Sequence, residues 1–294
     1  MTPLSRKDVL PLIRLALRED AAAHDLTSRA VILPTVRIRA RIVAKDTGIL
    51  AGGPVAVRTF HAVDPSLRCV LIRREGAALA KGQTILTVEG RARSIFAAER
   101  TALNFLGHLS GIATLTHAFV QHVKPYPVKI LDTRKTLPGL RLLEKYAVGI
   151  GGGHSHRSDL AEAILIKTNH VRAYSVQRTA FSKTIKEMVQ TARRKAGGKF
   201  VEIEVMNFTE FKTAVEAKPD AILLDNWTVT AIPKAVSCLH AARSTLNARP
   251  LLEVSGGVTL ANVRAIAKSG VDRISIGRLT HSAPALDLSL EVLL

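Results

Sequence analysis

Six short apolar runs in the last two thirds of the chain constrain its fold more than any other feature. They recur at intervals of about 20–35 residues, with helical stretches between them. Continuous apolar runs of this kind are typical of strands buried on both faces of a parallel sheet. The runs are KILDT (129–133), AILIK (163–167), VEIEV (201–205), AILLD (221–225), LLEVS (251–255) and RISIG (273–277). They predict βα units arranged as a parallel α/β barrel.

Each apolar run ends in a charged residue or a glycine. In a parallel barrel the carboxyl ends of the strands converge on one mouth, where active sites lie. Several charges delivered to one mouth indicate a site for a large, highly charged ligand. The run ends are Arg134-Lys135, Lys167, Glu204, Asp225, Ser255-Gly256-Gly257 and Gly277.

The first hundred residues have a different pattern. Residues 36–45 alternate apolar and Arg side chains, the period of a half-buried strand, and short strands are expected at 68–72 and 84–89. With an amphipathic helix within residues 1–20, this predicts a small α+β sandwich. Residues 97–121 have helical spacing, and Gly107 and Gly111 mark either a helix end or a close helix–helix approach.

The charge balance is unusual for a globular chain. Lys and Arg number 42 and Asp and Glu 24, a net charge of +18. Such a surface suits nucleic acid, an anionic membrane or small polyanionic substrates. Aromatic residues are only 4% and the basic residues are spread along the chain, which disfavours single-strand binding by base stacking.

Cysteine content and the N-terminus indicate a cytosolic protein. Cys69 and Cys238 are the only cysteines, so a disulfide framework and a Cys-rich zinc module are excluded. The N-terminal stretch has neither the continuous apolar segment nor the cleavage site of a signal peptide, and no apolar run is long enough to span a bilayer.

For several groups of residues, the sequence alone allows more than one interpretation. The glycines at 256, 257 and 277 either cradle a phosphate at helix N-termini or serve as ordinary turn glycines; a Walker A loop is absent. Glu204 and Asp225 either bind Mg²⁺ together with substrate phosphates or pair with neighbouring cations. Lys167 could also form a Schiff base.

The stretch from 132 to 160 is the densest in charge. Its cations suit carboxylates and phosphates, and its histidines could ligate a metal as the triad His154, His156 and His170. The charged and imidazole side chains in question are Arg134, Lys135, Arg141, Lys145, His154, His156 and Arg157.

Taken together, these blocks resemble the quinolinate phosphoribosyltransferase family almost from end to end. The matching blocks are AERTALNFLGHLSGIATLT, DTRKTLPGLRLLEKYAVGIGGG, SHRSDL, LIKTNH, VEIEV, LLDNW, EVSGGVTLANV and GVDRISIGRLTHS. The resemblance implies the type II phosphoribosyltransferase fold: an N-terminal α/β sandwich, here residues 1–113, and an incomplete parallel α/β barrel, residues 114–294, whose C-terminal tail can pack back on the first domain.

The resemblance also implies an activity and partners. Members join quinolinate to phosphoribosyl pyrophosphate (PRPP) with Mg²⁺, giving nicotinate mononucleotide, pyrophosphate and CO₂ in NAD biosynthesis. They are cytoplasmic homodimers, sometimes assembled further, with the active site at the subunit interface. Neither nucleic acid nor membrane is an expected partner.

Site residues carry over position by position. Arg100 matches the arginine offered across the dimer interface to quinolinate, and Lys135, Glu204 and Asp225 match the catalytic positions. Glu204 and Asp225 also match the carboxylates near Mg²⁺, partly through PRPP and water. The remaining substrate-binding matches are Thr133, Arg134, His156, Arg157, Lys167, Ser255, Gly256, Gly257, Ser275 and Gly277.

The chain departs from the family's usual residues at four positions. They are His24, Ser155, Glu162 and Thr168, of which Thr168 replaces an acidic residue beside Lys167. A relative with another nitrogenous acceptor would keep dependence on PRPP and Mg²⁺ without releasing CO₂ from quinolinate. A nucleic-acid-binding barrel would instead bind duplexes with a steep salt dependence.

Overall fold

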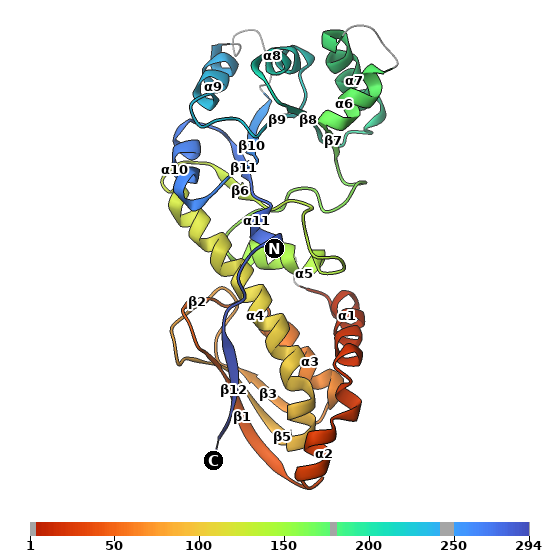
Figure 1. Ribbon diagram of the computed structural model, residues 1–294, viewed down its shortest axis with the longest axis vertical. Coiled ribbons are helices and arrows are strands. Elements are labelled where there is room, and N and C mark those ends of the chain that lie inside the picture. The colour runs from red at the N-terminus through yellow and green to blue at the C-terminus, as the bar shows by residue number, and fades with distance from the viewer. Residues whose placement is uncertain (1–3, 177–180, 242–249, 294) are drawn as a thin grey trace. The chain divides into compact units, whose positions relative to one another are not determined.

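The computed structural model describes residues 4–176, 181–241 and 250–293 (Figure 1). The chain divides into two compact units. Unit 1 comprises Met1–His117, Thr136–Gly152 and Arg278–Leu294, and unit 2 comprises Ala118–Lys135 and Gly153–Gly277. The boundary expected between residues 113 and 114 falls inside a helix that is continuous over Ala92–Val123.

Unit 1 is built on an antiparallel sheet with the strand order β12-β1-β5-β3. The alternation expected at 36–45 is confirmed, because Ala40 and Ile42 are buried whereas Arg37 and Arg39 are exposed. A separate two-stranded sheet pairs β2 with β4. The strands are β1 (Arg37–Ala44), β2 (Gly48–Ile49), β3 (Arg68–Leu71), β4 (Ala78–Leu79), β5 (Thr84–Arg91) and β12 (Leu288–Leu293).

The buried face of this sheet packs against two helices. Phe60 of α3 and Ile95 and Leu106 of α4 share one apolar cluster with Ile42 and Leu86 of the sheet. The helices with bounds in unit 1 are α1 (Arg6–Glu19), η1 (Ala22–His24), α2 (Leu26–Val31), α3 (Gly53–Val63), α5 (Arg141–Ile150) and α11 (Arg278–His281); α4 (Ala92–Val123) begins there and continues into unit 2.

The two glycines of α4 lie where another segment approaches the helix. The helix does not end there and the approaching residues 284–286 are not helical, so neither of the two expectations is correct. A Cβ at Gly107 would lie 2.8 Å from the carbonyl oxygen of Leu286, and one at Gly111 only 2.0 Å from that of Pro284. The approaching segment leads into β12, which pairs antiparallel with β1 from Arg39↔Leu293 to Ala44↔Leu288.

Unit 2 contains a six-stranded parallel sheet, and all six apolar runs form its strands. Their order is β6-β11-β10-β9-β8-β7, which leaves β6 and β7 at the two edges. This confirms the predicted α/β class with a separate N-terminal sheet. The strands are β6 (Lys129–Leu131), β7 (Ile164–Ile166), β8 (Val201–Val205), β9 (Ala221–Asp225), β10 (Leu251–Ser255) and β11 (Arg273–Ser275).

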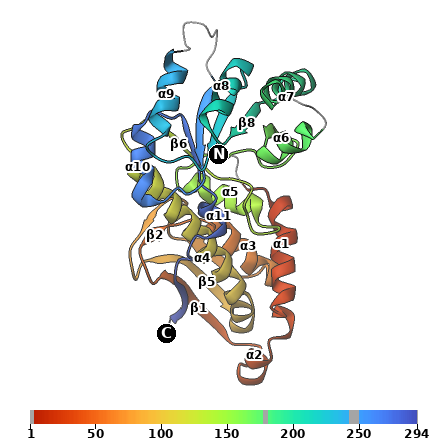
Figure 2. The ribbon, with the colours of Figure 1, turned by 45° about the horizontal axis from the view of Figure 1, so that its top comes forward.

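Helices follow the strands of unit 2 as βα units require. Figure 2 shows α7, α8 and α9 around the sheet. The helices are α6 (Thr168–Ser175), α7 (Phe181–Lys195), α8 (Phe208–Ala217), α9 (Ile232–Ala241) and α10 (Leu260–Lys268). Among the residues that the structure describes, no helix combines the length and apolar character needed to cross a bilayer.

Candidate active site

The carboxyl ends of the parallel strands carry most of the predicted site residues; the exceptions are Arg100 in α4 and His156 and Arg157 in the segment before β7. Because β6 to β11 are parallel, their ends meet at the same edge of the sheet, and each places one to three polar residues there. Thr133, Arg134 and Lys135 follow β6, Lys167 follows β7, Glu204 lies in β8, Asp225 ends β9, Ser255 ends β10 and Ser275 ends β11.

The best-defined contact of this edge is an ion pair between the ends of β7 and β8. Lys167 Nζ donates to Glu204 Oε2 at 2.5 Å, and Thr168 Oγ1 donates to Glu204 Oε1 at 2.8 Å. Burial opposes ionisation of Glu204, but these donors outweigh it and lower the pKa of its carboxyl. Pairing with a neighbouring cation, one of the two readings open for Glu204, is therefore present in the structure.

The departure at Thr168 has a structural role. An acidic side chain at this position would face the Glu204 carboxylate with a second negative charge, whereas the threonine hydroxyl and backbone N–H both donate to it. Lys167 is thus held in an ion pair with Glu204, which disfavours the free amine that a Schiff base requires.

Asp225 is the second acidic group of this edge and has an opposite pKa shift. Burial and the negative charge of Glu204 raise the pKa of Asp225, while Lys167 and Lys135 act against that rise. Its Oδ2 accepts a hydrogen bond from Asn226 Nδ2 at 2.9 Å. These interactions bring two carboxylates and two lysines from four strand ends into one group, as expected.

Two arginines lie close enough to each other to interact. Burial and the neighbouring charge of Arg134 lower the pKa of Arg157, with Glu202 and Asp159 opposing the shift. Arg157 Nη1 donates to the carbonyl oxygen of Ala163 at 3.0 Å. Two guanidinium groups brought together against their mutual repulsion are suited to a ligand with more than one carboxylate.

The side chain of His156 is only 9% exposed, and its contacts are with other parts of the protein. Its backbone N–H donates to Asp132 Oδ1 at 2.8 Å, and its Nδ1 accepts from the backbone N–H of Arg157 at 2.8 Å. Its Nε2 lies 3.0 Å from Glu202 Oε2 and 3.5 Å from Glu253 Oε1.

Sequence reasoning missed the buried charges of the strands themselves. Glu202 and Glu253 are 1% and 0% exposed, and Arg273 Nε contacts Glu253 Oε2 at 3.0 Å. Burial and the neighbouring charge of Glu202 raise the pKa of Glu253 to about 7. Charged residues inside otherwise apolar runs, in VEIEV and LLEVS, were the available signal, because both faces of such strands are buried.

The predicted histidine triad does not gather. Within the described part of the chain, one group of three or more potential metal-ligating side chains has its ligand atoms together, and it consists of His156, Glu202 and Glu253. His154 is outside that group, and His170 Nδ1 accepts a hydrogen bond from the backbone N–H of Lys167. The triad hypothesis is therefore wrong.

The loop after β10 has the backbone conformation expected of a phosphate cradle. Gly256 and Gly257 have φ of +87° and +61°, and a Cβ at Gly256 would lie 2.1 Å from Asn226 Oδ1. Nothing lies within 4 Å of a Cβ placed on Gly257. The loop leads into α10, so its N–H groups precede a helix N-terminus, which favours anions.

Arg100 is the one predicted site residue in unit 1. It lies in α4, and its side chain is exposed on a helix whose neighbouring residues Ala98, Thr101 and Ala102 are buried.

Comparison with known proteins finds one family over nearly the whole chain. The family model described as quinolinate phosphoribosyl transferase, N-terminal domain, matches residues 25–110, and that for the C-terminal domain matches residues 112–291. A probable nicotinate-nucleotide pyrophosphorylase (carboxylating) of Synechocystis is 38% identical over 96% of this chain and 92% of its own length. Quinolinate phosphoribosyltransferase (decarboxylating) 1 of Nicotiana glauca is 39% identical over 97% of this chain and 82% of its own length.

Solved structures give the same result for the fold. The nicotinate-nucleotide pyrophosphorylase from Francisella tularensis superimposes with a TM-score of 0.88 at 36% identity, covering 99% of this chain and 98% of its own. Sequence and structure comparisons thus agree on both units of the chain.

Proposed function

Since this chain belongs to the quinolinate phosphoribosyl transferase family, we propose that it transfers the phosphoribosyl group of PRPP to quinolinate. The products are nicotinate mononucleotide, pyrophosphate and CO₂, and the reaction serves NAD biosynthesis. The observation that carries the proposal is the grouping of Lys135, Lys167, Glu204 and Asp225 at one edge of the parallel sheet.

Charge complementarity supports these substrates. Quinolinate brings two carboxylates, for which the neighbouring Arg134 and Arg157 offer planar donors. PRPP brings a 5′-phosphate, which suits the backbone N–H groups of the 255–257 loop, and a pyrophosphate, which suits Lys135 and Lys167. A basic site attracts both anions and desolvates them together.

The first step is displacement at C1 of the ribose. The quinolinate ring nitrogen forms the new bond to C1 while the bond from C1 to the pyrophosphate oxygen breaks, its electron pair leaving with pyrophosphate. Positive charge develops on the ribose, and Glu204 and Asp225 stabilise it electrostatically. Lys135 and Lys167 balance the charge of the departing pyrophosphate.

The second step is loss of the carboxyl group next to the ring nitrogen. The carbon–carbon bond breaks to release CO₂, and its electron pair remains on the ring carbon, stabilised by the adjacent cationic nitrogen until that carbon takes a proton from water. The arginines hold the other carboxylate in place during this step.

Asp225 fits a role in holding Mg²⁺. This ion usually takes one or two protein carboxylates together with substrate phosphates. Asp225 has its pKa raised partly by the charge of Glu204, so a cation beside it relieves that repulsion. Glu204, already paired with Lys167, would act through water. When bound, the ion neutralises the charge developing on pyrophosphate.

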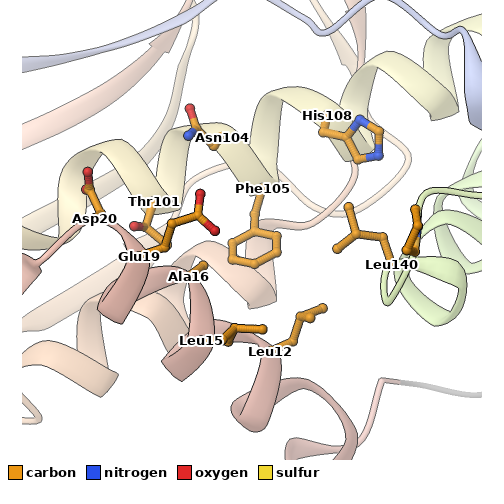
Figure 3. Close-up of a pocket in the computed structure, with 11 residues that line it drawn as sticks. Leu12, Leu15, Ala16, Glu19, Asp20, Thr101, Asn104, Phe105, His108 and Leu140 are labelled. Atoms are coloured by element: carbon orange, nitrogen blue, oxygen red, sulfur yellow. The ribbon is translucent and has the colours of Figure 1, made fainter.

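A homodimer that lends Arg100 to its partner is part of the proposal. Arg100 and Asn104 are exposed one turn apart on α4, beside a cavity of about 460 Å³. Figure 3 shows Phe105 of α4 in this cavity, opposite Leu12 and Leu15 of α1. An apolar hollow beside an exposed cation suits contact with a second copy of the chain. A cytoplasmic location of the protein stays a prediction.

Incubation with quinolinate, PRPP and Mg²⁺ tests the function. Quinolinate labelled in the 2-carboxyl group should yield labelled CO₂ and nicotinate mononucleotide in equal amounts. Nicotinate in place of quinolinate, and the Asp225→Asn variant, serve as controls that should give little product. PRPP consumption with another acceptor, and none with quinolinate, would favour the alternative phosphoribosyltransferase.

A further inference from the structure

The hydrogen bonds of His156 define which ring nitrogen carries its proton. The backbone N–H of Arg157 can only donate, so His156 Nδ1, 2.8 Å away, accepts and carries no proton. The proton therefore lies on Nε2, which donates to Glu202 at 3.0 Å. Both ring nitrogens are thus engaged inside the protein.

The partners of His156 are a buried charge cluster that needs an explanation. Glu202 and Glu253 are almost fully buried, and Arg273 contacts Glu253 at 3.0 Å. A buried ion pair is commonly no more stabilising than apolar residues of the same volume, because desolvation cancels the attraction. Stability alone therefore gives no reason for placing three charged side chains and a histidine in the centre of a parallel sheet.

The cluster fixes the backbone next to both arginines of the site. Asp132 lies two residues before Arg134 and accepts from the backbone N–H of His156 at 2.8 Å. His156 in turn holds the backbone N–H of Arg157. The segment from 154 to 157 is also tied to β6 through the bridge between Leu131 and His154. The backbone segments that carry Arg134 and Arg157 are therefore joined by hydrogen bonds.

We propose that Glu202, with Glu253 and Arg273, acts through His156 to position the backbone segments that carry Arg134 and Arg157, the arginines that bind the two carboxylates of quinolinate. His156 acts here as a positioning residue, through its hydrogen bonds to Glu202 and to the backbone of Arg157. This inference rests on the proposed function, because it concerns how that substrate is recognised.

A metal site at the same three residues is the competing interpretation. His156, Glu202 and Glu253 do have ligand atoms within 4.8 Å of one another. However, Arg273 Nε lies 3.0 Å from Glu253 Oε2. The positive charge of the guanidinium would repel a divalent cation bound to the same carboxylate. The geometry therefore favours positioning.

Steady-state kinetics of Glu202→Leu and Glu202→Gln test the proposal. Leucine removes the acceptor for His156 Nε2–H at similar volume, and we expect the KM for quinolinate to rise about tenfold with that for PRPP changed by less than about twofold. Glutamine keeps an acceptor oxygen and should recover most of the loss. Glu75→Leu is the matched control, since it removes an acceptor of two backbone N–H groups in unit 1 and should leave the ratio of the two KM values unchanged.

A second variant covers the case in which Glu202→Leu does not fold. His156→Gln keeps a donor for Glu202 but removes the acceptor of the Arg157 N–H, so it should also raise the KM for quinolinate selectively. An unchanged quinolinate KM in a folded variant, or equal rises for both substrates, would overturn the proposal.

Nitrogen NMR of the wild-type protein tests the geometry without turnover. The His156 signal, assigned by its loss in His156→Gln, should show a protonated Nε2 and an unprotonated Nδ1, with and without quinolinate. A proton on Nδ1 would refute the hydrogen-bond scheme. Absence of product with wild-type enzyme would instead refute the proposed function, and the NMR result would still decide the positioning of His156.

Discussion

The two sheets of this protein treat charge in opposite ways. In unit 1 the arginines of β1 lie on the solvent side, and Arg41 pairs with Glu291 at 2.9 Å with both side chains more than a third exposed. In unit 2 Arg273 pairs with Glu253 at 3.0 Å inside the sheet, where the carboxylate has no exposed surface. The two ion pairs have similar lengths, but one lies on a solvated surface and the other lies in the interior beside the proposed site.

The largest effect should come from removing the buried cation. Arg273→Met leaves the buried carboxylate of Glu253 without its guanidinium partner, and we expect the free energy of unfolding to fall by about 3–5 kcal/mol. Arg41→Met makes the same change in the exposed pair and should cost less than about 1 kcal/mol. Urea denaturation of both variants measures the difference, and equal losses would remove the distinction between the sheets.

The second effect concerns activity. Arg134→Ala or Lys135→Ala removes charge that complements an anionic substrate, so kcat/KM should fall about 100-fold or more with the melting temperature nearly unchanged. Arg39→Ala, on the solvent side of β1, loses the same charge as Arg134→Ala and should keep wild-type kinetics. Full activity in either site variant would contradict the assignment of the site.

A pH titration of stability sharpens the comparison further. The pKa of Glu253 is about 7 in the folded chain against 4.5 for the ordinary group. Between these values the unfolded chain binds fewer protons than the folded one, so stability is full below pH 4.5 and falls as pH rises through 7.

The expected loss from this group is about 1–3 kcal/mol. Denaturation of wild type and Glu253→Gln between pH 4.5 and 8 measures it as the difference between the two curves. Glu291→Gln, on the exposed pair, should leave the slope of the wild-type curve above pH 5 intact. Parallel curves for wild type and Glu253→Gln would show that Glu253 does not titrate in this range.

The smallest effect separates two glycines of similar conformation. Gly256 has φ of +87° with Asn226 against it, whereas Gly82 of unit 1 has φ of +82° in open space. Gly82→Ala should cost about 1 kcal/mol of strain. Gly256→Ala adds a steric clash, so we expect about 2 kcal/mol and a raised KM for PRPP. Unfolding and kinetics of the pair check this, and equal costs with unchanged KM would argue against a phosphate cradle.

Sequence patterns were sufficient for elements whose signal is local. The six parallel strands are continuous apolar runs, and Lys167, Glu204 and Asp225 stand at run ends, so topology alone brings them together. Glu202 and Glu253 lie inside the runs rather than at their ends, and their buried partners His156 and Arg273 are distant in the sequence, so the cluster is seen only in the folded chain.

Long-range pairing was the other limit. The alternation in LSLEVL is a strand signal, but nothing local indicates that β12 pairs with β1. The segment that leads into β12 also passes close to α4. Gly107 and Gly111 have no side chains to collide with it, so α4 continues through both glycines. Thr168 likewise differs from the family's usual residue. Its contact partner Glu204 lies on another strand, so the contact is seen only in the folded chain.

The pairing of β12 with β1 has a consequence for how the chain is made. Residues 39 and 293 are partners, so the sheet that contains β1 cannot be completed until the chain has been synthesised as far as β12. Until then β1 keeps one edge open, a template for association with other nascent chains. Deleting β12 should therefore harm solubility more than the small loss of buried surface suggests.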